Sequence, residues 1–131
     1  MSLRGAVHTK HRAGQLRDYS GLLLDRKITP SDIDGVIEYG DNIWVFIELK
    51  IEGVEMPYGQ RLMYERLVDD LAVTGKPTMC LVAEHNTSVE EQINAALCSV
   101  SEFRYRGKWH KPIRNINLRE AIDKFLDSEA K

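Results

Sequence analysis

The chain has 131 residues, of which 43% are hydrophobic and 29% charged, and its formal net charge at pH 7 is −2. This length suits one compact domain, and the composition excludes intrinsic disorder, which requires low hydrophobicity and high net charge. Charges interrupt each apolar run before the ~20 residues of a membrane-spanning helix, and the first residues lack the apolar stretch of a secretory signal. We therefore expect a cytoplasmic protein without a membrane partner, in which Cys80 and Cys98 are buried free thiols.

The charges are unevenly distributed along the chain. Residues 1–17 carry a net charge of +4 and residues 103–119 a net charge of +6, and neither segment contains an acid. The remaining residues therefore hold a net charge of −12. Solvated surface explains either basic segment alone, but two basic segments around an acidic site would suit a phosphate backbone held over metal ions.

Periodicity predicts the elements of the first half in chain order. Apolar residues at three- and four-residue spacing indicate an amphipathic helix over 10–24. A connector leads to a strand over 33–39, and the turn Gly40-Asp41-Asn42 follows. The apolar run 43–47 is rich in β-branched and aromatic residues, which is typical of a central strand covered on both faces. Its polar continuation, Glu48-Leu49-Lys50, is therefore a candidate functional segment.

The second half continues with alternating helices and strands. A helix over 58–74 ends at Gly75-Lys76-Pro77, and a buried strand follows over 78–83. We expect a helix over 88–97 with Ser88 as N-cap, a more exposed strand over 103–109 and an amphipathic helix over 117–127. The order α, β, β, α, β, α, β, α predicts a single α/β domain over residues 1–131, with a small central mixed sheet flanked by helices.

A three-residue loop at the first turn would place Asp34 directly opposite Glu48, with both side chains on one face of the sheet. A two-residue loop would instead pair Asp34 with Ile47 and turn the two acids to different faces. Asp32 shares the face of Asp34 and is the alternative first carboxylate. A solvated strand end with an Asp–Lys surface pair is the structural alternative to a functional site.

Carboxylates on directly opposed residues, with Cβ atoms roughly 4.5–5.5 Å apart, repel each other unless a cation lies between them. Hard oxygen ligands favour Mg²⁺ or Mn²⁺ over Zn²⁺. Lys50 shares the face of Glu48 and can neutralise charge, orient a water molecule or steady a phosphate oxygen. Gln60 opens the next helix, and Tyr64 lies one turn later on the same side, where both can form hydrogen bonds beside the acids. Tyr64 as a core residue with a hydrated hydroxyl is an equally open interpretation.

These residues resemble a known pattern. Residues 30–34, Pro-Ser-Asp-Ile-Asp, followed by Glu48-Leu49-Lys50, resemble the PD-(D/E)XK nuclease superfamily, in which a carboxylate begins one strand and Glu/Asp-x-Lys ends the next. Residues 60–64, Gln-Arg-Leu-Met-Tyr, further resemble the Gln-xxx-Tyr element of its RecB-like branch. The motifs cover residues 28–64, and the element order extends the resemblance loosely over 10–83. It implies a restriction-endonuclease-like core of order α-β-β-α-β.

The resemblance also implies roles for individual residues. The implied ligands of Mg²⁺ (or Mn²⁺) are Asp34, Glu48 and the carbonyl of Leu49. Lys50 would position the attacking water, Gln60 would support the site from the helix, and Tyr64 would approach the substrate backbone or Lys50. Many members place a Glu on the first helix, but residues 5–24 contain none, and Gln15 and Asp18 are the nearest substitutes. A site for one metal ion is compatible with this difference.

The expected function is a metal-dependent nuclease that hydrolyses DNA phosphodiester bonds. A chain of this size has no second domain for sequence recognition, so we also expect a homodimer or a partner protein. The candidate nucleic-acid-binding residues are Arg12, Arg17, Arg61, Arg104, Arg106, Lys108 and Lys111. Tyr105, Trp109 and His110 lie between these cations and could stack on unpaired bases, although a charge-protected edge strand explains the same pattern.

Two other hypotheses fit the sequence. In the first, a nuclease-like fold binds nucleic acid or protein without cutting, because resemblance in fold does not establish activity. In the second, an unrelated α/β domain carries Glu-x-Lys by chance, and Asp34 and Glu48 would then lie on opposite faces of the sheet.

Overall fold

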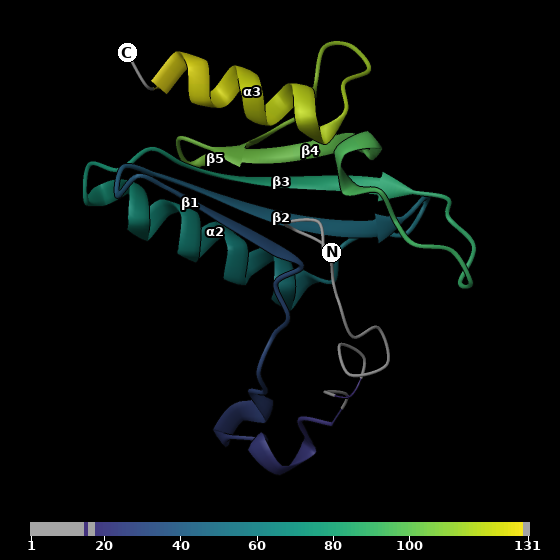
Figure 1. Ribbon diagram of the computed structural model, residues 1–131. Helices are drawn as coiled ribbons and strands as arrows, with labels where there is room; N and C mark the ends of the chain where they lie inside the picture. The colour runs from purple at the N-terminus through teal and green to yellow at the C-terminus, as the bar shows by residue number, and fades with distance from the viewer. Residues whose placement is uncertain (1–14, 16–17, 130–131) are drawn as a thin grey trace, which may run out of the picture. The chain divides into compact units, whose positions relative to one another are not determined.

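The computed structural model describes residue 15 and residues 18–129. The chain divides into two compact units, residues 1–32 and residues 33–131, and each is considered by itself. Residues 33–131 form the expected α/β fold, in which a five-stranded mixed sheet is flanked by two helices (Figure 1). No helix within the described residues is long and apolar enough to cross a membrane.

The five strands follow one another in the sheet in chain order. They are β1 (Gly35–Tyr39), β2 (Ile43–Ile51), β3 (Thr78–His85), β4 (Ser99–Tyr105) and β5 (Lys108–His110). Only β2 and β3 run parallel; the other neighbouring pairs are antiparallel. The parallel pair requires a crossover connection, which the helix α2 (Tyr58–Val73) provides. The strand β3 is therefore the middle strand of the sheet, and the carboxyl ends of β2 and β3 lie at the same end of the sheet.

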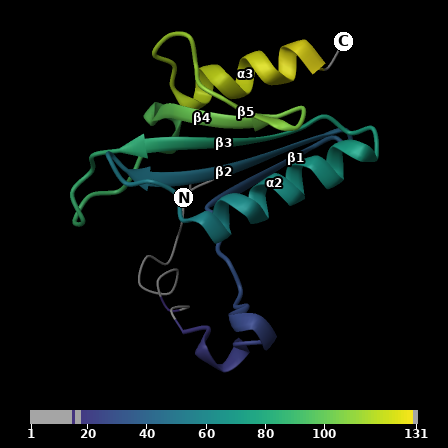
Figure 2. The same cartoon turned by 180° about the vertical axis from the view of Figure 1, so that it is seen from behind.

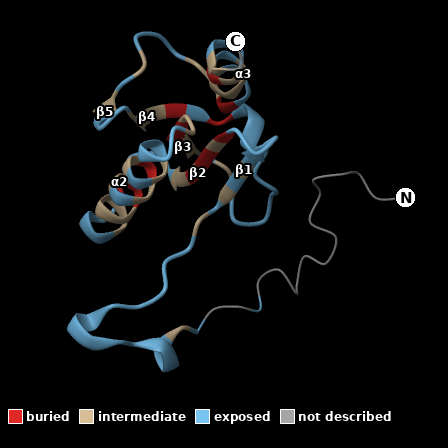
Figure 3. Cartoon of the chain, turned by 90° about the vertical axis from the view of Figure 1, so that its left-hand side faces the viewer, coloured by how far each residue is buried: buried red, intermediate tan, exposed pale blue. Residues whose placement is uncertain are grey.

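The helices α2 and α3 (Leu118–Glu129) cover opposite faces of this sheet (Figures 1 and 2). On the α2 face, Tyr64 and Val68 of the helix pack in one buried cluster with Phe46, Cys80 and Val82 of the sheet. On the α3 face, the second cluster joins residues of β2, β3 and β4 to the helix; its largest members are Leu81, Leu118 and Phe125. Figure 3 shows that burial concentrates on β2, β3 and the inner sides of the helices. The two clusters confirm a central sheet covered on both faces.

The register of the first hairpin is the one that a three-residue loop requires. Tyr39 pairs with Ile43, and the ladder runs to the pair Gly35 and Ile47. Asp41 in the loop has φ 60°, a left-handed conformation that Asp tolerates better than most residues. The two-residue alternative is therefore wrong, and Asp34 and Glu48 occupy the position one step beyond the last ladder pair.

The expected helix over 10–24 is not confirmed. Residues 1–14, 16 and 17 lie outside the described residues, and the described end of the range contains only the 3₁₀ turn η1 (Ser20–Leu22). A second 3₁₀ turn, η2 (Asp25–Lys27), follows it. The carboxylate of Asp18 accepts hydrogen bonds from the backbone N–H and the hydroxyl of Ser20, at 2.9 and 2.6 Å. Such local side-chain bonds compete with helix formation, and they were not anticipated from the apolar spacing.

Two predictions in the second half are wrong. Residues 88–97 form a loop that ends in the 3₁₀ turn η3 (Ala95–Leu97), because Val89, Ile93 and Leu97 are exposed and an isolated helix of this length is unstable without a buried face. Residues 103–109 belong to two strands, β4 and β5, joined by a tight turn. Arg106 and Gly107 both have positive φ, 50° and 77°, which is the conformation of a two-residue hairpin turn.

The start of α3 carries a reciprocal cap. The Asn117 side-chain oxygen accepts a hydrogen bond from the backbone N–H of Glu120 at 2.9 Å, and the Glu120 carboxylate accepts one from the backbone N–H of Asn117 at 3.4 Å. We predict that Asn117→Ala lowers the free energy of unfolding by about 1 kcal/mol, whereas Asn117→Asp retains the cap. Urea denaturation measures both, and equal stabilities of the alanine variant and the wild type would contradict this role.

Candidate active site

The candidate site lies on the α2 face, at the carboxyl end of β2. Asp34 precedes β1, and its Oδ2 accepts a hydrogen bond from the backbone N–H of Leu49 at 2.7 Å. This bond extends the contact between the two hairpin arms through a side chain and holds the Asp34 carboxylate against the backbone of the residue after Glu48. Asp34 is exposed, whereas Glu48 is only 4% exposed.

Both carboxylate oxygens of Glu48 have partners. The Tyr64 hydroxyl donates to Oε1 at 2.6 Å, and the Lys50 Nζ lies 3.0 Å from Oε2. A buried carboxylate loses its hydration, and its burial is tolerated only where hydrogen bonds and an opposite charge replace the lost water. Glu48 is therefore held in one orientation by a neutral donor on one oxygen and a cation on the other.

The predicted gathering of β2 and α2 side chains is confirmed. Glu48 and Lys50 are two residues apart and share one face of β2, and Gln60 and Tyr64 are one turn apart on α2. The Gln60 Oε1 accepts a hydrogen bond from the Lys50 Nζ at 2.8 Å. Tyr64 differs from the expectation, because its hydroxyl contacts Glu48 and not Lys50, and its ring is fully buried in the core.

The main chain supplies one more oxygen at this position. In an extended strand the N–H and C=O groups of one residue point to the same side, and the Leu49 N–H points toward Asp34. The Leu49 carbonyl thus faces the β1 side of β2, beyond Gly35, where the β1 ladder has ended. The carbonyl oxygen of Leu49 could therefore serve as a metal ligand together with Asp34 and Glu48.

This donor set fits a hard divalent cation. Two carboxylates and a main-chain carbonyl are the oxygen ligands that Mg²⁺ and Mn²⁺ prefer. Within the described residues no group of three His, Cys, Asp or Glu side chains gathers as a metal site. A cation at this position would have Asp34 and Glu48 as its carboxylate ligands, with water completing its coordination. The alternative carboxylate, Asp32, belongs to the other unit and accepts a hydrogen bond from the Tyr19 hydroxyl at 3.0 Å.

The predicted nucleic-acid-binding residues that the structure describes do not gather on one surface. Arg61 and Arg104 lie on the α2 face and form paired contacts with carboxylates: Arg61 with Glu102 at 3.0 and 2.9 Å, and Arg104 with Asp69 at 3.2 and 2.6 Å. Arg61 also stacks over Trp109, with its guanidinium carbon 4.1 Å from the ring centroid. Of these cations, Arg61 is nearest in sequence to the site, directly after Gln60.

The other predicted cations lie elsewhere. Arg106 lies in the β4–β5 turn and Lys108 directly after it, at the end of the sheet where β3 begins and thus away from Glu48. Lys111 lines a cavity on the α3 face. Arg12 and Arg17 lie outside the described residues.

The aromatic residues of the same segment make contacts within the domain. The Trp109 ring N–H donates to Glu65 at 2.7 Å, the His110 ring stacks on Phe103, and the Tyr105 ring packs edge-on against Phe125. These contacts hold the edge of the sheet, as the structural alternative for this segment predicted.

Sequence reasoning missed two acidic residues near the site. Glu102 lies in the same row of the sheet as Glu48, separated from it by Val82, and holds Arg61. Glu84 is the register partner of Lys50 in the adjacent strand and shares its face. The sequence does place Glu84 directly after the predicted buried strand over 78–83. Its position beside Lys50 could be predicted only with the knowledge that β2 and β3 are parallel.

Burial sets the protonation of the groups beneath the site. Desolvation and the hydrogen bond to Glu48 raise the pKa of the Tyr64 hydroxyl far above its ordinary value of 10.0, so Tyr64 is a permanent donor. Desolvation also raises the pKa of the Cys80 thiol, which lies on the same face. Both Cys80 and Cys98 are free and buried, as expected. Neither Tyr64 nor Cys80 is a base at neutral pH.

No family model, curated protein or solved structure matches this chain. The chemistry assigned to the site therefore rests on its residues and their geometry.

The buried hydroxyl has a measurable consequence for stability. Because the folded-state pKa of Tyr64 is raised, its contribution is fully present below pH 10 and is lost as the pH rises and the unfolded chain releases the proton. We predict that Tyr64→Phe reduces the decline of unfolding free energy between pH 10 and 11 by up to about 1.4 kcal/mol per pH unit. Urea denaturation across this range tests it.

The same experiment has a matched control. Tyr58→Phe removes the hydroxyl of an exposed tyrosine on the same helix, which isolates the effect of burial. At pH 7, Tyr64→Phe also leaves Glu48 Oε1 without its donor, which costs about 1–3 kcal/mol. A decline with pH that is identical in Tyr64→Phe and the wild type would show that Tyr64 does not hold its proton as described.

Proposed function

We propose that this protein is a metal-dependent nuclease that hydrolyses DNA phosphodiester bonds, with a site of the PD-(D/E)XK type. The observation that carries the proposal is the joint placement of Asp34, Glu48 and Lys50. Asp34 lies directly before β1 and is bonded to the Leu49 N–H, next to Glu48 on β2, and Lys50 lies 3.0 Å from the Glu48 carboxylate. A merely solvated strand end explains this less well, because Glu48 is buried and both its oxygens are occupied.

Asp34, Glu48 and the Leu49 carbonyl would hold Mg²⁺ or Mn²⁺. When bound, the ion would lower the pKa of a water ligand and offset negative charge on the phosphate. The two carboxylates need a cation between them, since like charges on adjacent strands repel. Lys50 partly meets this need for Glu48, while Asp34 is bonded only to a backbone N–H among the described contacts.

Lys50 would orient the attacking water or steady a phosphate oxygen. Its ammonium has three donors, and the structure shows two of them directed at Glu48 and Gln60. The third is left for a water molecule or for substrate. Gln60 fixes the direction of this third donor, since its amide oxygen holds the ammonium from the α2 side.

Tyr64 would act through Glu48 and not on the substrate. Its raised pKa keeps it a hydrogen-bond donor, and its complete burial separates it from a bound phosphate. By fixing Oε1 of Glu48, it would leave Oε2 as the oxygen that faces Lys50 and the ion. Tyr64 is thus a positioning residue in this proposal.

DNA is the proposed substrate because the site suits a phosphodiester and two basic segments flank the acidic part of the chain. Among the described cations, Arg61 is the best placed to meet a phosphate, as it follows Gln60 on α2. A phosphate would have to replace Glu102, which now binds the Arg61 guanidinium through two hydrogen bonds.

The test is cleavage of linear, circular, single-stranded and branched DNA with Mg²⁺ or Mn²⁺. We predict metal-dependent cleavage by the wild type and a loss of about 10²–10⁴-fold in rate for Asp34→Asn, Glu48→Gln and Lys50→Gln. The control is Asp41→Asn, which changes an exposed acid at the opposite end of the same hairpin and should cleave at the wild-type rate.

The alternative function is also an outcome of this experiment. A wild-type protein that binds DNA but cleaves no substrate with either metal would indicate a nuclease-like binding module. Cleavage that survives in all three site variants would place the active site elsewhere or identify a contaminant. Circular dichroism of each variant ensures that the comparison is between folded proteins.

A further inference from the structure

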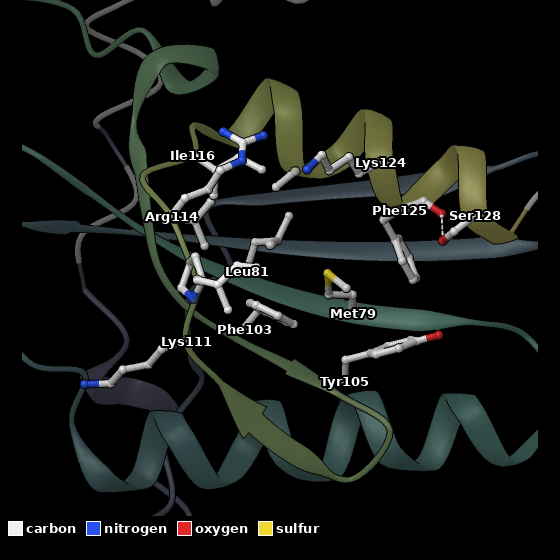
Figure 4. Close-up of a pocket in the computed structure, with 14 residues that line it drawn as sticks. Met79, Leu81, Phe103, Tyr105, Lys111, Arg114, Ile116, Lys124, Phe125 and Ser128 are labelled. Atoms are coloured by element: carbon white, nitrogen blue, oxygen red, sulfur yellow. Dashed lines mark hydrogen bonds between the residues drawn. The ribbon is translucent and has the colours of Figure 1, made fainter.

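A cavity of about 470 Å³ lies on the α3 face of the sheet, opposite the candidate active site (Figure 4). Met79 and Leu81 of β3 and Phe103 and Tyr105 of β4 line its sheet side, and Phe125 of α3 lines its helix side. The lining is predominantly apolar, and the volume falls within the range of about 300–1,000 Å³ typical of small-molecule sites. Its walls therefore suit an apolar ligand or ligand segment.

The segment 111–117 between β5 and α3 borders the cavity and contributes Lys111, Pro112, Ile113, Arg114 and Ile116 to its lining. It is tied at its far end, where Val100 N–H donates to the Ile116 carbonyl and Leu118 N–H donates to the Cys98 carbonyl, each at 2.9 Å. At its near end it follows β5, which ends at His110. Between these attachments Ile113 is fully exposed although it lines the cavity. An apolar side chain in water beside an apolar cavity indicates a surface that gains from being covered.

The charged side chains in the lining of the cavity are three cations, Lys111, Arg114 and Lys124, and no acid. Figure 4 draws Arg114 and Lys124 near the same end, whereas the Lys111 side chain points away. Arg114 is 3.5 Å from Glu120, and Lys124 forms no ion pair with another described residue. With Arg114 paired to Glu120 and Lys124 without an ion pair among the described residues, this part of the lining favours an anionic group over a cationic one.

We propose that this cavity binds a free aliphatic carboxylate, with the chain against Leu81 and Phe125 and the carboxylate between Arg114 and Lys124. An unbranched apolar chain suits the apolar walls that α3 and two strands provide, and the anion suits the cations in the lining. The basic segment 1–17 is a poor occupant by charge. The inference is independent of the proposed nuclease activity, since the two sites lie on opposite faces of the sheet.

The first test is isothermal titration of the full chain with octanoate, decanoate and dodecanoate below their critical micelle concentrations. Because each buried CH₂ group changes affinity by up to about fourfold, we expect Kd to fall by several-fold for each two carbons added. Dodecyltrimethylammonium, with the same chain and the opposite charge, should bind at least tenfold more weakly than dodecanoate. No binding of dodecanoate, or equal affinity for both head groups, would overturn the proposal.

Variants then locate the site. Ala121→Leu adds a larger side chain to the cavity wall and should abolish dodecanoate binding. The double variant Arg114→Gln with Lys124→Gln should weaken dodecanoate binding about fivefold and leave 1-dodecanol binding unchanged. Lys108→Gln is the matched control, because Lys108 is an exposed cation outside the cavity lining. Unchanged dodecanoate binding in Ala121→Leu and in the double variant would show that the ligand does not bind in this cavity. If Ala121→Leu does not fold, the double variant alone decides the test.

Two further probes distinguish a free aliphatic carboxylate from other anionic ligands. Sedimentation with phosphatidylglycerol vesicles tests whether the surface instead recognises an anionic lipid headgroup, and 1-naphthoate tests an aromatic carboxylate. Binding to vesicles without binding of free dodecanoate, or tight binding of 1-naphthoate alone, would contradict the assignment of a free aliphatic carboxylate.

Discussion

The buried carboxylate of Glu48 is the constraint on which the candidate site depends. A carboxylate that is 4% exposed is stable only if each oxygen has a partner, and the partners come from two different elements. Tyr64 reaches it from α2 and Lys50 from β2 itself. The position of α2 along the sheet is therefore coupled to the carboxyl end of β2, and Gln60 is brought to Lys50 by the same placement.

The crossover from β2 to β3 makes this arrangement possible. Because α2 begins shortly after β2 ends and returns along the sheet to β3, its first turns lie over the carboxyl end of β2. Gln60 and Tyr64 face that end, while Val68 further along packs in the apolar cluster beneath the helix. The same helix thus supports polar groups at one end and closes the core along the rest of its length.

The local part of this arrangement could be predicted from the sequence. The turn Gly40-Asp41-Asn42 fixes the loop length, and the loop length fixes which residues face each other across β1 and β2. Once Asp34 is known to face Glu48, the two-residue period of the strand places Lys50 on the same face of β2 as Glu48. The helical spacing of Gln60 and Tyr64 then places both on one side of α2.

What the sequence did not reveal depends on contacts between distant segments. Glu102 lies far along the chain from Arg61, yet it takes up the guanidinium that we expected to be free for DNA. The stripe of Val89, Ile93 and Leu97 has helical spacing, but these side chains are exposed and no other described residue buries them. The Arg106-Gly107 turn is a local signal that alternation across residues 103–109 obscured. In the first two cases a partner elsewhere in the fold, or its absence among the described residues, decided the outcome.

The most direct test of the central claim is the affinity of the protein for a divalent cation in the absence of DNA. Titration with Mn²⁺, followed by electron paramagnetic resonance of the free ion, should show one site in the wild type and in Asp41→Asn. In Asp34→Asn and Glu48→Gln the affinity should fall at least tenfold, since each variant removes one of two charged ligands. Equal affinity in all four proteins would show that Asp34 and Glu48 do not form a cation site, and the proposed chemistry would fall with it.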